Sequence, residues 1–120
     1  MAKGTVKLVN AVFYAHHGVM QEEHRIGGRY EVDVIIDLDL ERAATTDSLE
    51  HTVDYELVYR LVKDIVTRNH FYLIEKLAYL IAEEVRKTYP QVDNIEVAVR
   101  KPNPPVGGTA DHAEARIRLP

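Results

Sequence analysis

The sequence contains no cysteine. Disulfide bonds and thiolate chemistry are therefore excluded, and the absence is compatible with a reducing compartment. The sequence also lacks an apolar run long enough to cross a bilayer, and its first residues lack the apolar stretch of a secretory signal. These absences predict a soluble, cytoplasmic protein without a membrane partner.

Clustered positive charge is also missing. The 15 lysine and arginine residues are scattered along the chain, and the formal net charge is −4. Because nucleic-acid phosphates are neutralised by a basic stripe or patch, no nucleic-acid partner is expected. The composition is that of a globular protein, with 46% hydrophobic and 28% charged residues. We expect residues 1–120 to form a single domain.

Several signatures of enzyme chemistry are absent as well. The sequence has no GxSxG elbow, no glycine-rich phosphate loop and no dinucleotide fingerprint. Its six histidines raise the question of a metal ion, but they lack the short spacing of ligand pairs. His16 and His17 are adjacent, so on an extended chain they point to opposite faces. Neither a metal site nor a bound cofactor is predicted.

Period-two alternation of apolar and polar residues predicts four strands. The pattern is strongest in residues 30–40, where apolar residues occupy one face and carboxylates occupy much of the other. Residues 112–119 alternate in the same way, and residues 5–14 and 94–101 have the composition of strands. The physical meaning of such alternation is a sheet with one dry face and one wet face.

Helical spacing replaces this alternation in the middle of the chain. Apolar residues recur at helical spacing from Tyr55 and again from Ile74, which predicts two helices. Residues 15–29 and 41–54 show no clear period, so we expect loops there. The resulting order is β-β-α-α-β-β, an α+β fold with two helices packed on the dry face of an antiparallel sheet. Such a sheet has two open edges, which invite pairing with another chain, so we expect an oligomer.

One charge breaks the alternation of the third predicted strand. Ile95, Val97 and Val99 share a face, and Lys101 falls on that same face. When only the strand pattern is considered, the simpler interpretation is favoured: a lysine at the strand end whose ammonium group extends into water. In the alternative, the apolar face and the rigid Pro-Asn-Pro-Pro turn withdraw the lysine from solvent. A partly desolvated ammonium group can carry protons near neutral pH.

Three further residues are candidates that carry little information when taken singly. Glu23 lies in a loop bounded by glycines and is interpreted as a solvated carboxylate. Glu75 lies early in the second helix, where a carboxylate suits the helix dipole. Tyr55 begins the first helix, where an aromatic ring packs while its hydroxyl stays in water.

Four separated segments nevertheless form a specific combination. They are "FYAHHGVMQEEHRIGGRYEVDV", "TDSLEHTVDY", "LIEKLA" and "VRKPNPPV". In this order and at this spacing they resemble the dihydroneopterin aldolases of folate biosynthesis, small enzymes of the tunnelling fold. The sequence departs from that family after "NPPV", where "GGTADH" replaces Pro-Gly-His-Tyr, which predicts a more flexible loop after Lys101.

The resemblance assigns a role to each candidate residue. It implies that Lys101 is the acid-base residue and that Glu23 belongs to the active site. Tyr55 would lie in the pocket, with a supporting role in catalysis. Glu75, together with the backbone of Ile74, would hold the pterin. The resemblance also implies a homo-oligomer, a ring of four subunits that stacks into an octamer, with sites between neighbouring subunits.

The reaction implied by the resemblance is the retro-aldol cleavage of 7,8-dihydroneopterin. Its products are 6-hydroxymethyl-7,8-dihydropterin and glycolaldehyde. The negative charge left on the carbon attached to the ring is absorbed by the C=N bond of the dihydropterin as an enamine. The substrate thus supplies its own electron sink, which accounts for chemistry without a metal or cofactor.

Three alternatives stay open at the level of the sequence. Epimerisation of the side chain, including that of dihydroneopterin triphosphate, would use the same lysine, although no basic cluster favours a triphosphate. Lys101 could instead form a Schiff base, but dihydroneopterin has no carbonyl group at the cleavage point. A non-catalytic ring-forming scaffold is the third alternative, and the presence of all four side chains counts against it.

Overall fold

The computed structural model describes residues 1–120 and contains all four predicted strands in one antiparallel sheet. The strands are β1 (Lys3–Ala15), β2 (Gly28–Asp39), β3 (Asn94–Pro102) and β4 (His112–Leu119). Their spatial order is β1-β2-β3-β4, so β1 and β4 form the two edges. In β2 every second residue from Tyr30 to Leu38 is buried, which confirms the predicted dry face.

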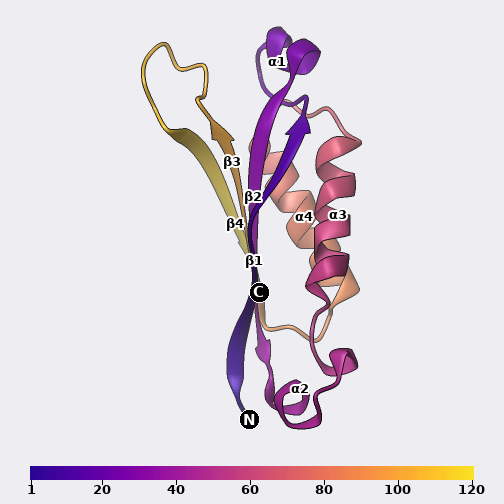
Figure 1. Cartoon of the computed structure of the whole chain (residues 1–120). Coiled ribbons are helices and arrows are strands. Elements are labelled where there is room, and N and C mark those ends of the chain that lie inside the picture. The colour runs from indigo at the N-terminus through magenta and orange to yellow at the C-terminus, as the bar shows by residue number, and fades with distance from the viewer.

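Two long helices, α3 (Tyr55–Thr67) and α4 (Ile74–Thr88), cover one face of this sheet (Figure 1). The buried stripe of α3 consists of Val58, Val62 and Val66, one turn apart. Asp54 begins α3 as its N-cap, because its carboxylate accepts the backbone N–H of Glu56 at 3.0 Å. The predicted α+β fold, with both helices on the dry face, is confirmed. None of the helices is long and apolar enough to span a membrane.

The two connections predicted as loops contain short helices, so the predicted element order was incomplete. They are α1 (Gln21–Ile26), α2 (Glu41–Thr46) and the 3-10 turn η1 (Leu49–His51). None of these elements buries a residue. Because an apolar stripe is the signal that predicts a helix, elements without a buried face leave no periodicity to detect.

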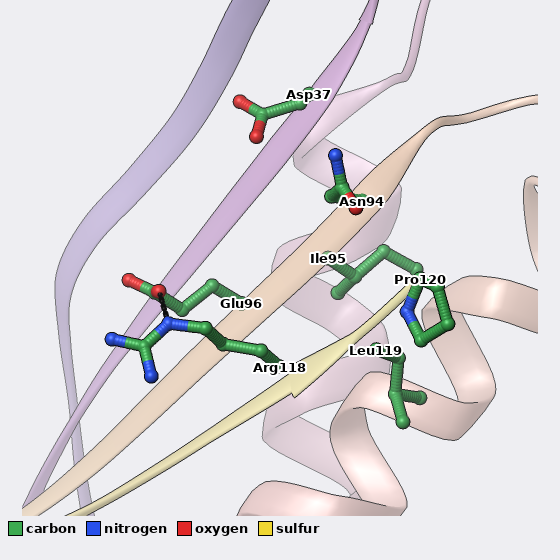
Figure 2. A pocket seen from close by; sticks show the side chains of 7 residues that line it. All are labelled: Asp37, Asn94, Ile95, Glu96, Arg118, Leu119 and Pro120. Atoms are coloured by element: carbon green, nitrogen blue, oxygen red, sulfur yellow. Dashed lines mark hydrogen bonds and ion pairs between the residues drawn. The ribbon is translucent and has the colours of Figure 1, made fainter.

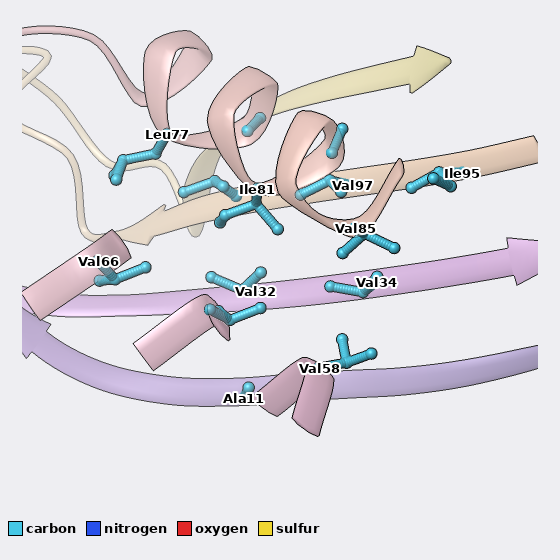
Figure 3. Packing of buried hydrophobic residues seen from close by; sticks show 14 of the residues in the cluster. Ala11, Val32, Val34, Val58, Val66, Leu77, Ile81, Val85, Ile95 and Val97 are labelled. Carbon is cyan, nitrogen blue, oxygen red and sulfur yellow. The ribbon is translucent and has the colours of Figure 1, made fainter. Parts of the chain in front are cut away.

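The core lies between the helices and the central strands β2 and β3. Figure 3 shows Val32 and Val34 of β2 facing Ile81 and Val85 of α4. These four residues are completely buried. Removing a side chain of this size from water stabilises the fold by about 1.5–3 kcal/mol. The packed core between the helices and the sheet is therefore a rigid support for residues at the ends of these elements.

The open face of the sheet carries a ladder of charges instead. Arg100 of β3 donates two hydrogen bonds to Asp33, at 2.6 and 2.9 Å, and others to Glu31, Glu114 and Asn10. Asn10 lies at a bulge in β1 with a φ of 56°. Its backbone N–H donates to Asp33 Oδ1 at 2.7 Å. These bonds tie β1, β2, β3 and β4 together on the face without helices.

Candidate active site

Lys101, near the end of β3, forms an ion pair with Glu23 of α1. The distance from Lys101 Nζ to Glu23 Oε2 is 2.6 Å. Only 18% of the lysine side chain and 17% of the glutamate side chain are exposed. The lysine is therefore withdrawn from solvent. This contradicts the simpler interpretation of the sequence, in which it extends into water. Glu23 is likewise not the solvated carboxylate expected of it when taken alone.

The lysine owes its position to the strand below it and the turn beyond it. Lys101 pairs with Ala113 of β4, and Val99, two residues earlier on the same face, is fully buried. The β3–β4 connection starts with Asn103, whose backbone N–H donates to Asp111 O at 3.0 Å and whose φ is 49°. The strand thus delivers the ammonium group to the end of the sheet, where α1 supplies its partner.

The carboxylate of Glu23 is held from both sides. Its Oε1 accepts the backbone N–H of Met20 at 3.1 Å, while its own backbone N–H donates to Met20 O at 3.1 Å. Gly18 packs directly beneath the carboxylate, since a Cβ atom at Gly18 would lie 2.3 Å from Glu23 Cδ. A side chain at position 18 would therefore displace the glutamate.

A cavity of about 230 Å³ opens beside this ion pair. Its lining residues are Glu23, Gly27, Gly28, Arg29, Tyr30, Lys101, Pro102, Asn103 and Pro105. Pockets that enclose a small molecule commonly measure about 300–1,000 Å³. The cavity is thus smaller than a complete binding site, although it exposes both a cation and an anion that could exchange a proton with a ligand.

A larger hollow, of about 310 Å³, lies at the other end of β3 and β4 (Figure 2). Two of its charged side chains, Glu96 and Arg118, pair with each other, and the third, Asp37, accepts the hydroxyl of Thr5 at 2.7 Å. Glu96 accepts from Arg118 Nε at 2.5 Å on one oxygen and from Arg116 Nη1 at 2.6 Å on the other. These arginines hold the pKa of Glu96 below its usual value against the opposing effect of desolvation, the largest influence on it. These ion pairs link β3 to β4, and none of the predicted site residues lines this hollow.

The remaining predicted site residues lie at two different ends of the molecule. Ile74 and Glu75 form the first turn of α4, at the same end as α1 and the end of β3 (Figure 1). Glu75 is exposed and its side chain has no hydrogen-bond or ion-pair partner. Tyr55 is 63% exposed at the start of α3, whose 13 residues span about 20 Å. A single chain therefore brings Lys101, Glu23 and the start of α4 to one end but leaves Tyr55 at the other.

Two residues near the ion pair were missed as site residues by sequence reasoning. His17 is completely buried, and Tyr30, which is 2% exposed, lines the cavity. Burial lowers the pKa of His17 and raises the pKa of Tyr30 to about 12. The alternation of Phe13 and Ala15 on the buried face of β1 was the signal that could have placed His17 inside. No group of three or more metal-ligating side chains is positioned to hold a metal ion.

Comparison with known proteins supplies the context for this site. A family model described as dihydroneopterin aldolase matches residues 6–118. The dihydroneopterin aldolase of Bacillus subtilis (strain 168) is 43% identical over 96 residues, covering 80% of each chain. That of Streptococcus pyogenes serotype M6 is 37% identical over 103 residues, covering 86% of this chain and 87% of its own.

Solved structures show the same fold at lower identity. The Escherichia coli dihydroneopterin aldolase in complex with neopterin matches with a TM-score of 0.89 at 20% identity, covering 98% of this chain and 99% of its own. A dihydroneopterin aldolase from Burkholderia bound to guanine matches with a TM-score of 0.78 at 24% identity, covering 98% of this chain and 90% of its own.

Proposed function

Because the chain belongs to the dihydroneopterin aldolase family, it is a lyase that acts on dihydroneopterin in folate biosynthesis, and we propose that Lys101 carries the proton transfers of its reaction. The observation that carries this proposal is the 2.6 Å ion pair of Lys101 with Glu23 beside a cavity. Of the three ammonium donors of a lysine, only one is used by the protein here. The other two are available to a substrate hydroxyl or to ordered water.

Each step of the proposed reaction balances without a further reactant. Lys101, as the free amine that forms when its ammonium group gives a proton to water, takes the proton of the side-chain hydroxyl through ordered water and with the assistance of Tyr55. The carbon–carbon bond then breaks, its electron pair moves into the C=N bond of the ring as an enamine, and glycolaldehyde leaves. Lys101 returns a proton to the ring-attached carbon, giving 6-hydroxymethyl-7,8-dihydropterin. General acid-base catalysis of this kind contributes about 100- to 10,000-fold.

Glu23 is the group that holds substrate and water against the lysine. Its carboxylate is fixed by Met20 on one oxygen and by Lys101 on the other. A carboxylate at this distance also keeps the ammonium group at the mouth of the cavity instead of in bulk water. This arrangement supports a role for Glu23 in orienting the side chain that is cleaved.

Recognition of the pterin ring falls to the start of α4. The carboxylate of Glu75, free of protein partners, can accept two hydrogen bonds from the ring NH and the exocyclic amine. The first backbone N–H groups of a helix, including that of Ile74, have no partner within the helix. Neopterin and guanine, the ligands named for two structural relatives, share this aminopyrimidinone edge.

Tyr55 joins the site from a neighbouring subunit in this proposal. Several observations favour a homo-oligomer: two open sheet edges, a cavity too small to enclose the substrate, and exposed apolar residues on β1, including Val12 and Tyr14. The radius of gyration is 15.7 Å, larger than the about 13.6 Å of a compact domain of this length. We propose a ring of four single-domain chains, stacked as an octamer.

Subunit complementation tests both the residues and the shared site. Lys101→Ala and Tyr55→Ala are each expected to be inactive as pure oligomers. Dissociating and reassembling them together creates some sites that contain both native residues, about a quarter on random mixing. Partial return of activity is expected. No return, with mixed oligomers verified by native mass spectrometry, would contradict a site built from two subunits.

A further inference from the structure

His17 is a buried, polar side chain close to the proposed site, and all of its polar atoms have partners within the protein. Its Nδ1 atom lies 2.9 Å from the backbone N of Phe71, in the connection between α3 and α4. Its Nε2 atom lies 2.7 Å from the backbone O of Val66, in α3. One imidazole therefore bridges the segment after β1 to the last turn of α3 and to the connection that follows it.

The backbone partners determine the protonation state of this ring. The N–H of Phe71 can only donate, so Nδ1 must accept, and Nε2 must carry the proton that it donates to Val66 O. A second proton on Nδ1 would set two donors against each other. The titratable groups that face His17 are His16, His24, His70 and Tyr30. The three histidines oppose a positive charge on His17, as does its burial.

Tyr30 of β2 holds the backbone of the same residue. Its hydroxyl accepts the N–H of His17 at 3.2 Å and donates to the carbonyl oxygen of His17. The phenol ring lies edge-on to the imidazole, with ring centres 5.3 Å apart. Both the side chain and the backbone of His17 are thus fixed, and Tyr30 also forms part of the cavity wall.

Gly18, the next residue, transmits this fixed position to Glu23. Its N–H donates to Phe71 O at 2.9 Å, and its carbonyl oxygen lies 2.6 Å from His24 Nε2. Its Cα packs beneath the Glu23 carboxylate, with no space for a Cβ atom. Since α1 buries no residue of its own, the hydrophobic core does not fix the position of Glu23 directly.

We propose that His17, in its neutral form and together with Tyr30, is a positioning residue for the aldolase reaction, which fixes Gly18 and thereby the carboxylate of Glu23 beside Lys101. This inference rests on the proposed function of the Lys101–Glu23 pair. Neither His17 nor Tyr30 transfers a proton to the substrate. Misplacement of the reacting groups by about 1 Å can cost about 100-fold in rate, so a residue that acts only through position affects turnover.

A matched pair of variants isolates the hydrogen bond of His17. Asparagine and leucine have the same branched shape, but only asparagine offers an acceptor near the position of Nδ1 to the N–H of Phe71. We expect His17→Leu to lower kcat by at least about tenfold and His17→Asn to recover most of that loss, with KM changing less than kcat. Tyr30→Phe removes only the hydroxyl and is expected to lower kcat by about three- to tenfold.

Val85→Ala is the control for lost stability, because Val85 is completely buried in α4 and remote from the ion pair. Its folded fraction should turn over normally. Unchanged kcat in both folded Tyr30→Phe and His17→Leu would overturn the inference. If the His17 variants fail to fold, Tyr30→Phe decides alone. Lys101→Ala in the same assay separates this inference from the proposed function on which it rests. Retained turnover in that variant would overturn the role of Lys101 in proton transfer.

Discussion

Arg100 and Lys101 are consecutive cations of β3 that point to opposite faces of the sheet and meet different surroundings. All five guanidinium donors of Arg100 are used, on Asp33, Glu31, Glu114 and Asn10. The bidentate bond from Arg100 holds the pKa of Asp33 below its usual value, and the same bond raises the pKa of Arg100. This charge is fully compensated within the protein and has a structural role.

Lys101 shows the opposite arrangement. It has one carboxylate partner, Glu23, and its remaining donors face a cavity. The two pairs have similar charge and similar burial, so neither property by itself separates structure from chemistry. What separates them is the number of hydrogen bonds left unmade. An incompletely satisfied cation beside a cavity is the pattern expected where a substrate must supply the missing partner.

Among substitutions that retain both Lys101 and Glu23, Gly18→Ala is expected to have the largest effect. It disturbs the Lys101–Glu23 pair and leaves the Arg100–Asp33 pair intact. A methyl group at this position collides with the Glu23 carboxylate, and the φ of Gly18 is 136°, which other residues rarely adopt. We expect a loss of about 100-fold or more in kcat/KM. Gly108→Ala is the control, because a Cβ atom there meets nothing within 4 Å. Equal activity of the two variants would show that Glu23 need not be held.

Arg100→Met should produce the reverse outcome, a loss of stability without a loss of turnover. The substitution leaves the carboxylates of Asp33 and Glu31 without their shared cation, and we expect a decrease of about 2 kcal/mol in the free energy of unfolding. Arg118→Met, at a largely exposed side chain, is expected to change it by less than about 0.5 kcal/mol. Urea unfolding measures both. A drop in kcat for folded Arg100→Met would remove the functional distinction between the two cations.

Glu23→Gln tests how much of the site depends on the charge of its carboxylate. Glutamine retains the shape and can still accept the N–H of Met20, but it cannot compensate the ammonium group of Lys101. We expect kcat/KM to fall by about tenfold, less than for Gly18→Ala, because position is preserved. Steady-state kinetics of the two variants, measured side by side, give the comparison. A larger loss in Glu23→Gln would mean that charge, and not position, dominates.

Lowering the pH should weaken the hydrogen bonds of His17 and the Arg100–Asp33 network at different pH values. The pKa of His17 is lowered from 6.5 by burial, so its contribution to stability is present above pH 6.5 and is lost as the pH falls through its folded value. The pKa of Asp33 is lowered from 3.8, so its contribution is lost only below that pH. Between pH 7 and 5, the hydrogen bonds of His17 should weaken while the Arg100–Asp33 network on the open face stays intact.

Hydrogen exchange at two backbone amides distinguishes the His17 contacts from the Arg100–Asp33 network. The N–H of Phe71 donates to His17 and that of Asn10 donates to Asp33. After correction for intrinsic exchange, protection of Phe71 should decrease from pH 7 to 5, by at most about 1.4 kcal/mol per pH unit, while Asn10 stays constant. In His17→Asn the pH dependence at Phe71 should disappear. A parallel decrease at both amides would indicate general loosening.

Much of the fold is predictable from the sequence because each strand alternates between a more exposed and a less exposed face, and each long helix has a buried face. Lys101 stood out for the same reason, as a charge at an apolar position of β3, but the strand pattern alone favoured a solvated lysine, and its role came from the family resemblance. The short helix α1 was missed since it buries nothing, and with it the means by which Glu23 is held. The pairing of Glu23 with Lys101 joins residues 78 positions apart, which no local pattern specifies. His17 was weighed in the sequence only as a metal ligand and rejected in that role, so its place as a hydrogen-bonded core residue was not predicted.

The most direct measurement is a product assay on the two neighbouring cations. Wild type, Lys101→Ala and Arg100→Met are incubated with 7,8-dihydroneopterin, the mixtures are oxidised, and the fluorescent pterins are separated by chromatography. The account predicts 6-hydroxymethylpterin from wild type and from folded Arg100→Met, and a loss of at least about 100-fold in Lys101→Ala. Near-normal product formation by Lys101→Ala would contradict the assignment of proton transfer to this lysine.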